Sequence, residues 1–342
     1  MKSLNLLTDI GWHGHAFLEQ TAHGLIPLRF LPEEIVGMGD MIPIARMQTG
    51  IELTLSGQIQ TLTVMARCLN TDHYGITAEL LANGQRHLPI WYIKTNSDEK
   101  GKTEPQKQTW TFRPDQQPVH IRLLLPTHCE LEFLEVSVND EAVIWSSPND
   151  HRPVWIAHGD SITQGANVAM PSATWPFQAA RSCDLQAYNL SIGGHGRAEP
   201  EMAAAIARRS DADLLSLHLG TNSLGFETAD QFGDRLNAFI STIHQAQPEL
   251  PIVVTSPIYR SRNGKDEWQY LAEYALTIED VCDGLNTGKP GQIHFINGLS
   301  LLQWSKGYMS DGLHLDEHGA SIFAQNFCEA AKIIFDTILI EP

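Results

Sequence analysis

The spacing of the apolar residues changes near residue 150, and this change most constrains how the chain can fold. Over residues 49–145 apolar side chains recur at every second position, as between Ile51 and Leu55. This period is typical of strands with one buried face. Asn83-Gly84 and Asn139-Asp140 supply turn signals between such stretches. The first half is therefore predicted to be an antiparallel, jelly-roll-like β-sandwich.

Beyond Pro153 the pattern becomes one of short apolar runs separated by longer helical patterns. Thr228 with Gln231 forms a capping box at the start of one helix, and Pro200 fits the first turn of another. Continuous apolar strands alternating with helices indicate a parallel sheet covered on both faces. The second half is therefore predicted to be α/β, with strands at residues 154–157, 187–190, 214–219, 252–255 and 293–296.

The polar, proline-containing stretch 146–153 lies where the period changes. A chain of 342 residues is also about twice the usual length of one domain. We therefore predict two domains, 1–150 and 151–342.

Composition excludes several classes of protein. Acidic residues outnumber basic residues by 40 to 23, and a net charge of −17 repels a phosphate backbone, so no nucleic-acid partner is expected. The chain lacks an uncharged run long enough for a membrane span, so no membrane partner is expected either. Residues 1–15 lack the apolar core of a signal peptide, which predicts a cytoplasmic protein; a chain whose signal had been removed would look the same.

The cysteines and histidines do not form a recognisable ligand pattern. The five cysteines show no CxxC spacing, and an odd number cannot be fully paired within one chain, so free and mostly buried thiols are expected. The fifteen histidines include no HExxH or comparable cluster. We assign no metal and no cofactor.

Polar, glycine-containing sequence follows directly after each of the first three predicted strands of the second half. These segments are His158–Ser161, Ser191–Gly196 and Gly220–Ser223. Ligands of parallel α/β sheets bind outside the carboxyl ends of the strands. The three loops are therefore expected to converge at one edge of the sheet.

These loops contain the residue types needed for acyl transfer. A serine hydroxyl becomes a strong nucleophile when a histidine takes its proton and a third group orients that histidine. Ser161 is the candidate nucleophile, His314 the base and Asp311 the orienting carboxylate. Preformed donors must also face the developing oxyanion. The candidates are the backbone N–H groups of Ser161 and Gly194 and the side-chain amide of Asn222.

Four blocks in this order resemble those of the SGNH (GDSL-type) hydrolases, across residues 154–320. They are Gly159–Ile162, Asn189–Gly196, Gly220–Asn222 and Asp311–His314. The resemblance implies the same roles for Ser161, Gly194, Asn222, Asp311 and His314, and a flavodoxin-like sheet of about five parallel strands. A β-sandwich ahead of such a domain is similar to the arrangement in some carbohydrate esterases and related acyltransferases.

Two further sets of residues leave alternatives open. The first lies near predicted strand ends and could line a substrate pocket or serve packing and the surface: Trp175, His195, Arg197, Tyr259 and Arg260. The second lies in the first half and could stack on sugars, although aromatic residues of a β-sandwich are more often core: Trp91, Trp110 and Trp145.

The sequence thus predicts a serine esterase that hydrolyses short acyl esters, such as acetyl esters of carbohydrates, through an acyl-Ser161 intermediate. The first domain would bind carbohydrate or shape the substrate site, and the expected partner is a small-molecule ester or acylated carbohydrate. Transfer of the acyl group to a hydroxyl of a small metabolite would use the same residues. A carbohydrate-binding protein without activity is disfavoured because Ser161, Asp311 and His314 are all present. The oligomeric state stays open.

Overall fold

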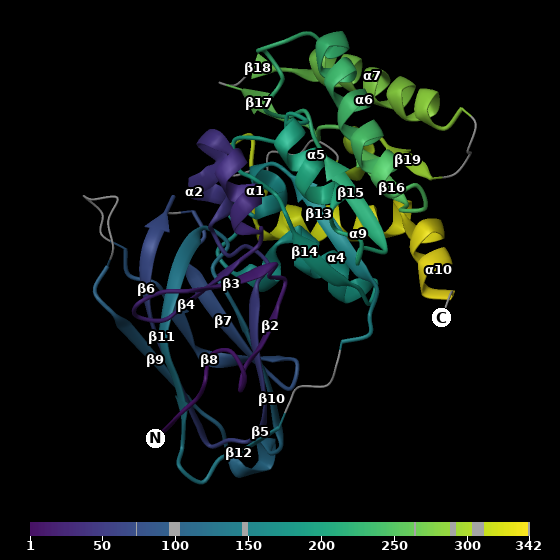
Figure 1. Ribbon diagram of the computed structural model, residues 1–342. Coiled ribbons are helices and arrows are strands. Elements are labelled where there is room, and N and C mark those ends of the chain that lie inside the picture. Colours follow the sequence, from purple (N-terminus) through teal and green to yellow (C-terminus); the bar gives the residue numbers. More distant parts are fainter. Residues whose placement is uncertain are drawn as a thin grey trace. The chain divides into compact units, whose positions relative to one another are not determined.

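The computed structural model describes residues 1–72, 74–95, 103–145, 150–262, 265–287, 292–302 and 311–340. The chain forms two compact units (Figure 1). Unit 1 comprises Met1–Ile35, Ile42–His151 and Ala169–Ser172, and unit 2 comprises Val36–Met41, Arg152–Val168 and Ala173–Pro342. Each unit therefore includes a short segment from the other half of the chain. Part of the expected boundary stretch, residues 146–149, lies outside the described residues.

Unit 1 is a pair of antiparallel sheets, as the alternating apolar pattern predicted. In the described residues one sheet has the order β3-β4-β11-β6-β9, with β1 beside β11, and the other has the order β12-β5-β10-β7-β8, with β2 beside β5. The first sheet contains β1 (Lys2–Ser3), β3 (Phe17–Gln20), β4 (Leu25–Leu28), β6 (Thr61–Thr71), β9 (Gln106–Thr111) and β11 (Cys129–Val138). The second contains β2 (Gly11–His13), β5 (Glu52–Gln58), β7 (Thr77–Ala82), β8 (Gln85–Tyr92), β10 (Val119–Leu124) and β12 (Val143–Trp145). Short helices α1 (Pro32–Gly37) and α2 (Ile42–Ala45) lie between β4 and β5 in the chain.

The core of unit 1 accounts for two of the three tryptophans considered above. Trp91 and Trp110 are 4% and 1% exposed and pack edge to face, with ring centroids 6.3 Å apart. Trp145 is 39% exposed. Core packing is thus the outcome for Trp91 and Trp110 and not for Trp145.

The predicted turn at Asn83-Gly84 joins β7 to β8, and both of its residues have positive φ, which asparagine and glycine tolerate.

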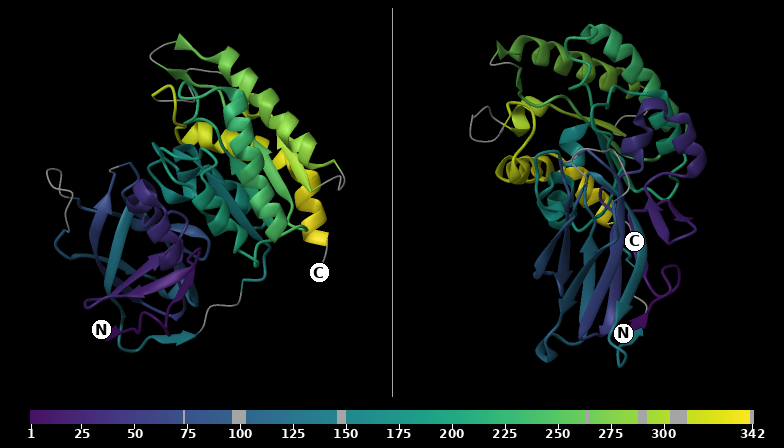
Figure 2. Two further views of the ribbon diagram at one scale, coloured as in Figure 1. Left: turned by 45° about the horizontal axis from the view of Figure 1, so that its top comes forward. Right: turned by 90° about the vertical axis from the view of Figure 1, so that its left-hand side faces the viewer.

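Unit 2 is built on a parallel sheet with the order β14-β13-β15-β16-β19. Its strands are β13 (Val154–Gly159), β14 (Gln186–Asn189), β15 (Leu214–His218), β16 (Ile252–Thr255) and β19 (Ile293–Ile296). Helices α4 (Trp175–Ser182) and α9 (Glu317–Ala330) cover one face, and α5 (Pro200–Ala207), α6 (Ala229–Ala246) and α7 (Trp268–Leu285) cover the other (Figure 2). The described chain also contains α3 (Ser161–Gln164), α8 (Gly298–Leu301), α10 (Lys332–Ile340) and the hairpin of β17 (Ser261–Arg262) and β18 (Lys265–Asp266). The prediction of an α/β fold with a parallel sheet is confirmed.

Local sequence signals fix the ends of these helices. Thr228 accepts a hydrogen bond from the N–H of Gln231 at 3.2 Å, and the Gln231 side chain accepts one from the N–H of Thr228 at 3.1 Å. This is the predicted capping box of α6, which satisfies two N–H groups that the helix cannot pair internally. Pro200 stands in the first turn of α5, where its missing N–H costs nothing.

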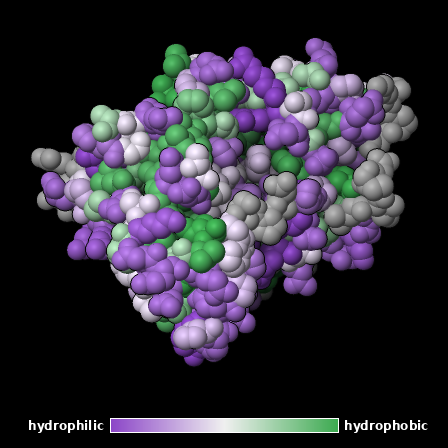
Figure 3. Space-filling model, turned by 60° about the horizontal axis from the view of Figure 1, so that its bottom comes forward, coloured by the Kyte–Doolittle hydropathy of each residue, from purple (hydrophilic) through white to green (hydrophobic). Residues whose placement is uncertain are grey.

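On the face shown in Figure 3, hydrophilic and hydrophobic side chains are interleaved. No helix within the described ranges is long and apolar enough to cross a bilayer. All five cysteines are free; Cys68, Cys129 and Cys282 are buried, whereas Cys183 and Cys328 are half-buried with their sulfur atoms 2.8 Å apart.

Candidate active site

The central strand β13 runs directly into the helix that carries Ser161. The Asp160 carboxylate, which is fully buried, accepts a hydrogen bond from the N–H of Ile162 at 2.8 Å and so caps α3. Gly159 lets the strand end close to β15, because a Cβ there would lie 2.9 Å from the carbonyl oxygen of His218. These two residues place Ser161 at the carboxyl end of the central strand. Asp160 thus stabilises the start of α3.

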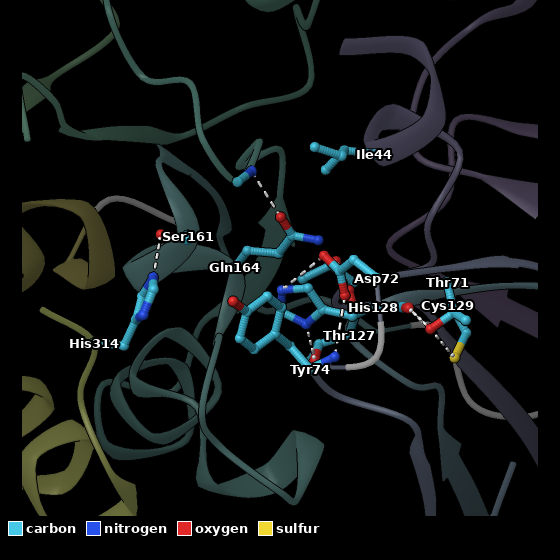
Figure 4. A network of polar contacts seen from close by, with 12 residues as sticks. Ile44, Thr71, Asp72, Tyr74, Thr127, His128, Cys129, Ser161, Gln164 and His314 are labelled. Atoms are coloured by element: carbon cyan, nitrogen blue, oxygen red, sulfur yellow. Dashed lines mark hydrogen bonds and ion pairs between the residues drawn. The ribbon is translucent and has the colours of Figure 1, made fainter. Parts of the chain in front are cut away.

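A continuous chain of hydrogen bonds joins Ser161, His314 and Asp311. The hydroxyl Oγ of Ser161 lies 2.8 Å from Nε2 of His314 (Figure 4). Nδ1 of His314 lies 2.7 Å from Oδ2 of Asp311. A carboxylate can only accept, so Nδ1 carries the proton and Nε2 is left to accept from the serine. The sequence offset of three between Asp311 and His314 therefore does bring the two side chains together.

The turn that begins at Asp311 holds its carboxylate in place. Oδ1 accepts hydrogen bonds from the backbone N–H groups of Leu313, at 2.9 Å, and His314, at 2.6 Å. Partial burial raises the pKa of the Asp311 carboxyl, but these two N–H groups and the His314 imidazole outweigh burial and lower it below its usual value. The carboxylate is therefore ionised at neutral pH, as its orienting role requires.

Backbone hydrogen bonds bring the three glycine-containing loops together at one edge of the sheet. The N–H of Ile192 donates to the carbonyl of Gly159 at 2.9 Å, and the N–H of Gly220 donates to the carbonyl of Gly196 at 3.0 Å. The second loop is thus hydrogen-bonded to both the first and the third. The convergence expected from the sheet topology is present.

Gly194 lies at an open position of the second loop. Its φ is +76°, and a Cβ built on it would meet nothing within 4 Å. A Cβ on the preceding Gly193 would lie 3.6 Å from Cβ of Ser161, so this turn packs beside the candidate nucleophile. Asn189 anchors the start of the loop by donating to the carbonyl of Thr163 at 2.9 Å. The turn that packs beside Ser161 therefore leaves open space on the Cβ side of Gly194.

Asn222 is held by the same loop. Its side-chain Nδ2 donates one hydrogen bond to the carbonyl of His195 at 2.7 Å. An amide nitrogen carries two hydrogens, so this bond fixes the amide and leaves a second hydrogen as a candidate oxyanion donor. The preceding residue, Thr221, is fixed by Arg260, whose guanidinium donates to its carbonyl at 2.5 Å.

Three of the five tentative substrate residues have structural contacts instead. Trp175 is 2% exposed and packs against the rings of Trp155, Phe323 and Phe327 in the core. Tyr259 and Arg260 are 6% and 7% exposed, and Arg260 pairs with Glu267 at 2.5 Å. Packing, the alternative that the sequence left open, fits the burial of these three residues.

His195 and Arg197 lie on the second loop beside Gly194 and are half-buried. Nδ1 of His195 lies 3.2 Å from the carboxylate of Glu199. The Arg197 guanidinium lies over the ring of Phe226, 5.3 Å from its centroid, and this ring is 70% exposed. Of the five tentative residues, these two stay candidates for substrate contact.

Two polar residues close to the triad were missed from the sequence. The side-chain oxygen of Gln164 accepts from the N–H of Gly193 at 2.7 Å, and Nδ2 of Asn167 donates to Oδ2 of Asp311 at 3.1 Å. Gln164 is the last residue of α3, and Asn167 lies beyond that helix with positive φ, so no helical spacing marks the two residues in the sequence. Among the residues that the structure describes, no group of three or more His, Cys, Asp or Glu side chains is placed to hold a metal ion.

Residues 157–322 match the family model of the GDSL-like lipase/acylhydrolase family. This part of the chain therefore belongs to that family, which is the SGNH class that the four sequence blocks resemble. This family match places residues 157–322 in a class of carboxylic ester hydrolases. A search of curated proteins found no match.

Solved structures are similar to the chain over nearly its whole length. A salicylyl-acyltransferase, SsfX3, from a tetracycline biosynthetic pathway is 22% identical, with a TM-score of 0.81 and 98% of each chain covered. A protein described as a GDSL-like lipase from Bacteroides ovatus is 19% identical, with a TM-score of 0.76 and coverage of 97% of this chain and 96% of that one. A family two carbohydrate esterase from Clostridium thermocellum, solved with cellohexaose, is 12% identical, with a TM-score of 0.70 and coverage of 95% and 99%. At these identities the similarity shows a shared fold with counterparts of both units.

Proposed function

We propose that the protein is a serine esterase in which Ser161 is the nucleophile, His314 the general base and Asp311 the residue that orients the base. The observation that carries this proposal is the pair of hydrogen bonds from Ser161 to His314, at 2.8 Å, and from His314 to Asp311, at 2.7 Å. Nucleophile, base and orienting group within hydrogen-bond reach are the signature of nucleophilic acyl transfer.

The reaction follows from this arrangement in two halves. Ser161 Oγ attacks the ester carbonyl carbon while its proton passes to Nε2 of His314, and the resulting oxyanion faces the N–H groups of Ser161 and Gly194 and the amide of Asn222. Collapse breaks the bond to the alcohol, which leaves with the proton from His314. Water then attacks the acyl-serine with the same base, releasing the carboxylic acid and restoring Ser161.

The proposed substrates are short acyl esters, above all acetyl esters of carbohydrates. Polar and glycine residues crowd the loops around Ser161, including His195, Arg197 and Asn222. Each CH₂ of a long acyl chain gains about 0.8 kcal/mol when buried in an apolar site, and polar loops cannot supply that gain. The structural similarity to a carbohydrate esterase supports the same substrate class.

Acyl transfer to a hydroxyl of a small metabolite is the second candidate. The solved structure with a TM-score of 0.81 is an acyltransferase. Acyl transfer by this chain would use the same acyl-Ser161 intermediate as hydrolysis. The two functions differ only in whether water or another hydroxyl attacks that intermediate. Their difference therefore lies in the products formed when an acceptor alcohol is present.

Covalent labelling tests the chemistry. A fluorophosphonate probe is expected to modify the enzyme once, at the peptide that contains Ser161, as mapped by mass spectrometry. Modification at another serine would overturn the assignment.

Substrate profiling tests the acyl group and the acceptor. Turnover of p-nitrophenyl esters is expected to be highest for acetyl and to fall as the acyl chain lengthens from about two to about eight carbons. Acetylated xylose oligomers are expected to release acetate, with little acetylated product when glycerol or a free sugar is added. A maximum at about eight carbons would contradict the short-chain proposal, and acetylated acceptor as the main product would favour the acyltransferase.

A further inference from the structure

The short segment that begins at Ser161 contacts both other parts of the proposed catalytic machinery. We infer that Gln164 and Asn167 are positioning residues: Gln164 sets the place of the Gly193–Gly194 turn, and Asn167 sets the place of the Asp311 carboxylate. This inference rests on the proposed function, because it assigns a role to these residues only if Ser161, His314 and Asp311 carry out the reaction.

Gln164 connects α3 to the second glycine loop. Its side chain is fully buried, and its Oε1 accepts from the N–H of Gly193 at 2.7 Å (Figure 4). The fit is close, because a Cβ on Gly193 would come within 2.9 Å of that oxygen. Gln164 therefore holds the Gly193–Gly194 turn in place relative to α3, the helix that carries Ser161. A donor must lie 2.7–3.1 Å from the oxyanion to stabilise it, so a small shift of this turn would weaken the interaction.

Asn167 connects the end of the same segment to the acid. Its φ is +67°, a left-handed conformation that asparagine tolerates better than most other residues. The chain turns there after α3, and Nδ2 donates to Oδ2 of Asp311 at 3.1 Å. This is the same oxygen that accepts from the imidazole of His314 at 2.7 Å. Asn167 therefore contacts the oxygen on which the orientation of the base depends.

The two residues act on different properties of the reaction. Gln164 is uncharged and contacts the oxyanion side, so its loss should lower kcat without moving the pH profile. Asn167 contacts the carboxylate that faces the base, so a change of charge at this position should move the acidic limb of the kcat/KM profile. Measurements of kcat and of the pH profile on single variants can therefore tell the two roles apart.

Gln164→Met tests the first role, since it keeps the length of the side chain and removes its acceptor. We expect kcat for p-nitrophenyl acetate to fall about tenfold or more, with KM within about twofold and the pH profile unmoved. Gln247→Met is the matched control. The Gln247 amide donates to the carbonyls of Ile206 and Ala207, at 3.0 and 3.1 Å, after α6 and away from the strand ends that carry the site. It should lose stability with little change in kcat per active site, as titrated with fluorophosphonate.

Asn167→Gly and Asn167→Asp test the second role. Glycine accepts positive φ, so the first variant removes the donor without straining the backbone, and kcat/KM should fall about tenfold. The second keeps the shape and adds a carboxylate beside Asp311. A negative charge added beside the carboxylate that bonds the imidazole should move the acidic limb to higher pH by about one unit. Asn83→Gly and Asn83→Asp are the controls, because Asn83 also has positive φ, at +50°, and lies in the β7–β8 turn of unit 1.

The outcomes separate this inference from the function on which it rests. If Ser161→Ala turns over at the wild-type rate, the proposed function fails and the inference fails with it. If Ser161→Ala is inactive while Gln164→Met keeps more than half of kcat, the role of Gln164 is overturned. An unmoved pH profile for Asn167→Asp, or wild-type kcat/KM for Asn167→Gly, would overturn the role of Asn167 and leave the triad untouched.

Discussion

The two units differ in how they arrange buried polar groups. In unit 1 buried and half-buried carboxylates along the strands pair with arginines of neighbouring strands, as Glu132 does with Arg67 and Glu52 with Arg122 at 2.6 Å. In unit 2 polar side chains gather at the carboxyl ends of β13, β14 and β15. There Ser161, Asn189 and Asn222 bond to histidine or to backbone groups of neighbouring loops.

This difference separates polar groups that stabilise the fold from those that serve chemistry. The hydrogen-bonding groups of a paired charge are already bonded within the unit. Removing one partner leaves the other charge buried and unpaired, which costs free energy of folding. Polar groups around Ser161, the proposed nucleophile, instead leave Gly194 at an open position and the second hydrogen of the Asn222 amide as a candidate donor to a substrate. Substitutions in unit 1 should therefore change stability, and substitutions at the strand ends of unit 2 should change rates.

The largest effect is expected for Ser161→Ala. Loss of the nucleophile should lower kcat/KM by about 10⁴-fold or more, while the melting temperature stays close to that of the wild type because one small hydroxyl contributes little packing. Ester hydrolysis and thermal unfolding, measured on the same preparation, check the fall in kcat/KM and the unchanged melting temperature. A variant that unfolds together with its loss of activity would break the separation proposed here.

Asn222→Ala should have the next largest effect. Removing one oxyanion donor typically costs about 10²–10³ in kcat, and a second consequence is that the carbonyl of His195 loses its hydrogen bond. Binding of an uncharged substrate should change less than kcat. Steady-state kinetics with an acetyl ester would show this; a rise in KM at constant kcat would mean that Asn222 binds the ground state.

Glu132→Ala tests the other side of the comparison. In unit 1 the Glu132 carboxylate, with a side chain 2% exposed, pairs with Arg67. Removing one member of a buried ion pair costs about 3 kcal/mol or more, whereas the double variant Arg67→Met/Glu132→Leu should lose less because no unpaired charge is left. Urea unfolding of the three proteins measures the difference. Equal losses for the single and double variants would show that the pair matters through packing alone.

The smallest effect concerns Glu199, the partner of His195. Burial raises the pKa of the Glu199 carboxyl, but hydrogen bonds from His195 and from backbone N–H groups outweigh it and lower the pKa below its usual value. A lowered folded-state pKa stabilises the protein above the unfolded-state pKa, and this stabilisation is lost as pH falls through the folded-state value.

Glu199→Gln should therefore flatten the decline of the melting temperature below about pH 5, by about 2 °C or less. Glu201→Gln, at an exposed position of α5, is the control. Melting curves from pH 7 to about pH 3 supply the test. The prediction is wrong if the Glu199 variant shows the same decline as the control.

Sequence patterns predicted unit 2 better than unit 1. The run 252–255 coincides with β16, because a strand buried on both faces is a continuous apolar run. The run 293–296 coincides with β19, in which His294 and Phe295 are half-buried. In unit 1, β4 (Leu25–Leu28) was not predicted. All four of its residues are buried, so it shows no alternation, and Pro27 interrupts its β pattern. Short β1 and β2 likewise lie before the stretch with a readable period.

The candidate site likewise contains residues that the sequence predicted and residues that it did not. Ser161, Asp311 and His314 could be proposed from the sequence because each is a residue type that the chemistry requires within a recognisable block. Gln164 and Asn167 could not, because their partners lie 29 and 144 positions away and are ordinary turn residues and carboxylates until the chain is folded. Trp175 shows the converse, since its place near a strand end concealed a core position.

The exchange of segments between the units has a consequence for synthesis on the ribosome. Unit 1 is complete only when Ala169–Ser172 is present, since Ala169 accepts a hydrogen bond from Thr77 and the N–H of Ser172 donates to Glu79 at 3.3 Å. The 17 residues between His151 and Ala169 take about one to four seconds to translate. During that interval the nascent sandwich lacks its last segment, which is synthesised only after Ser161 and α3.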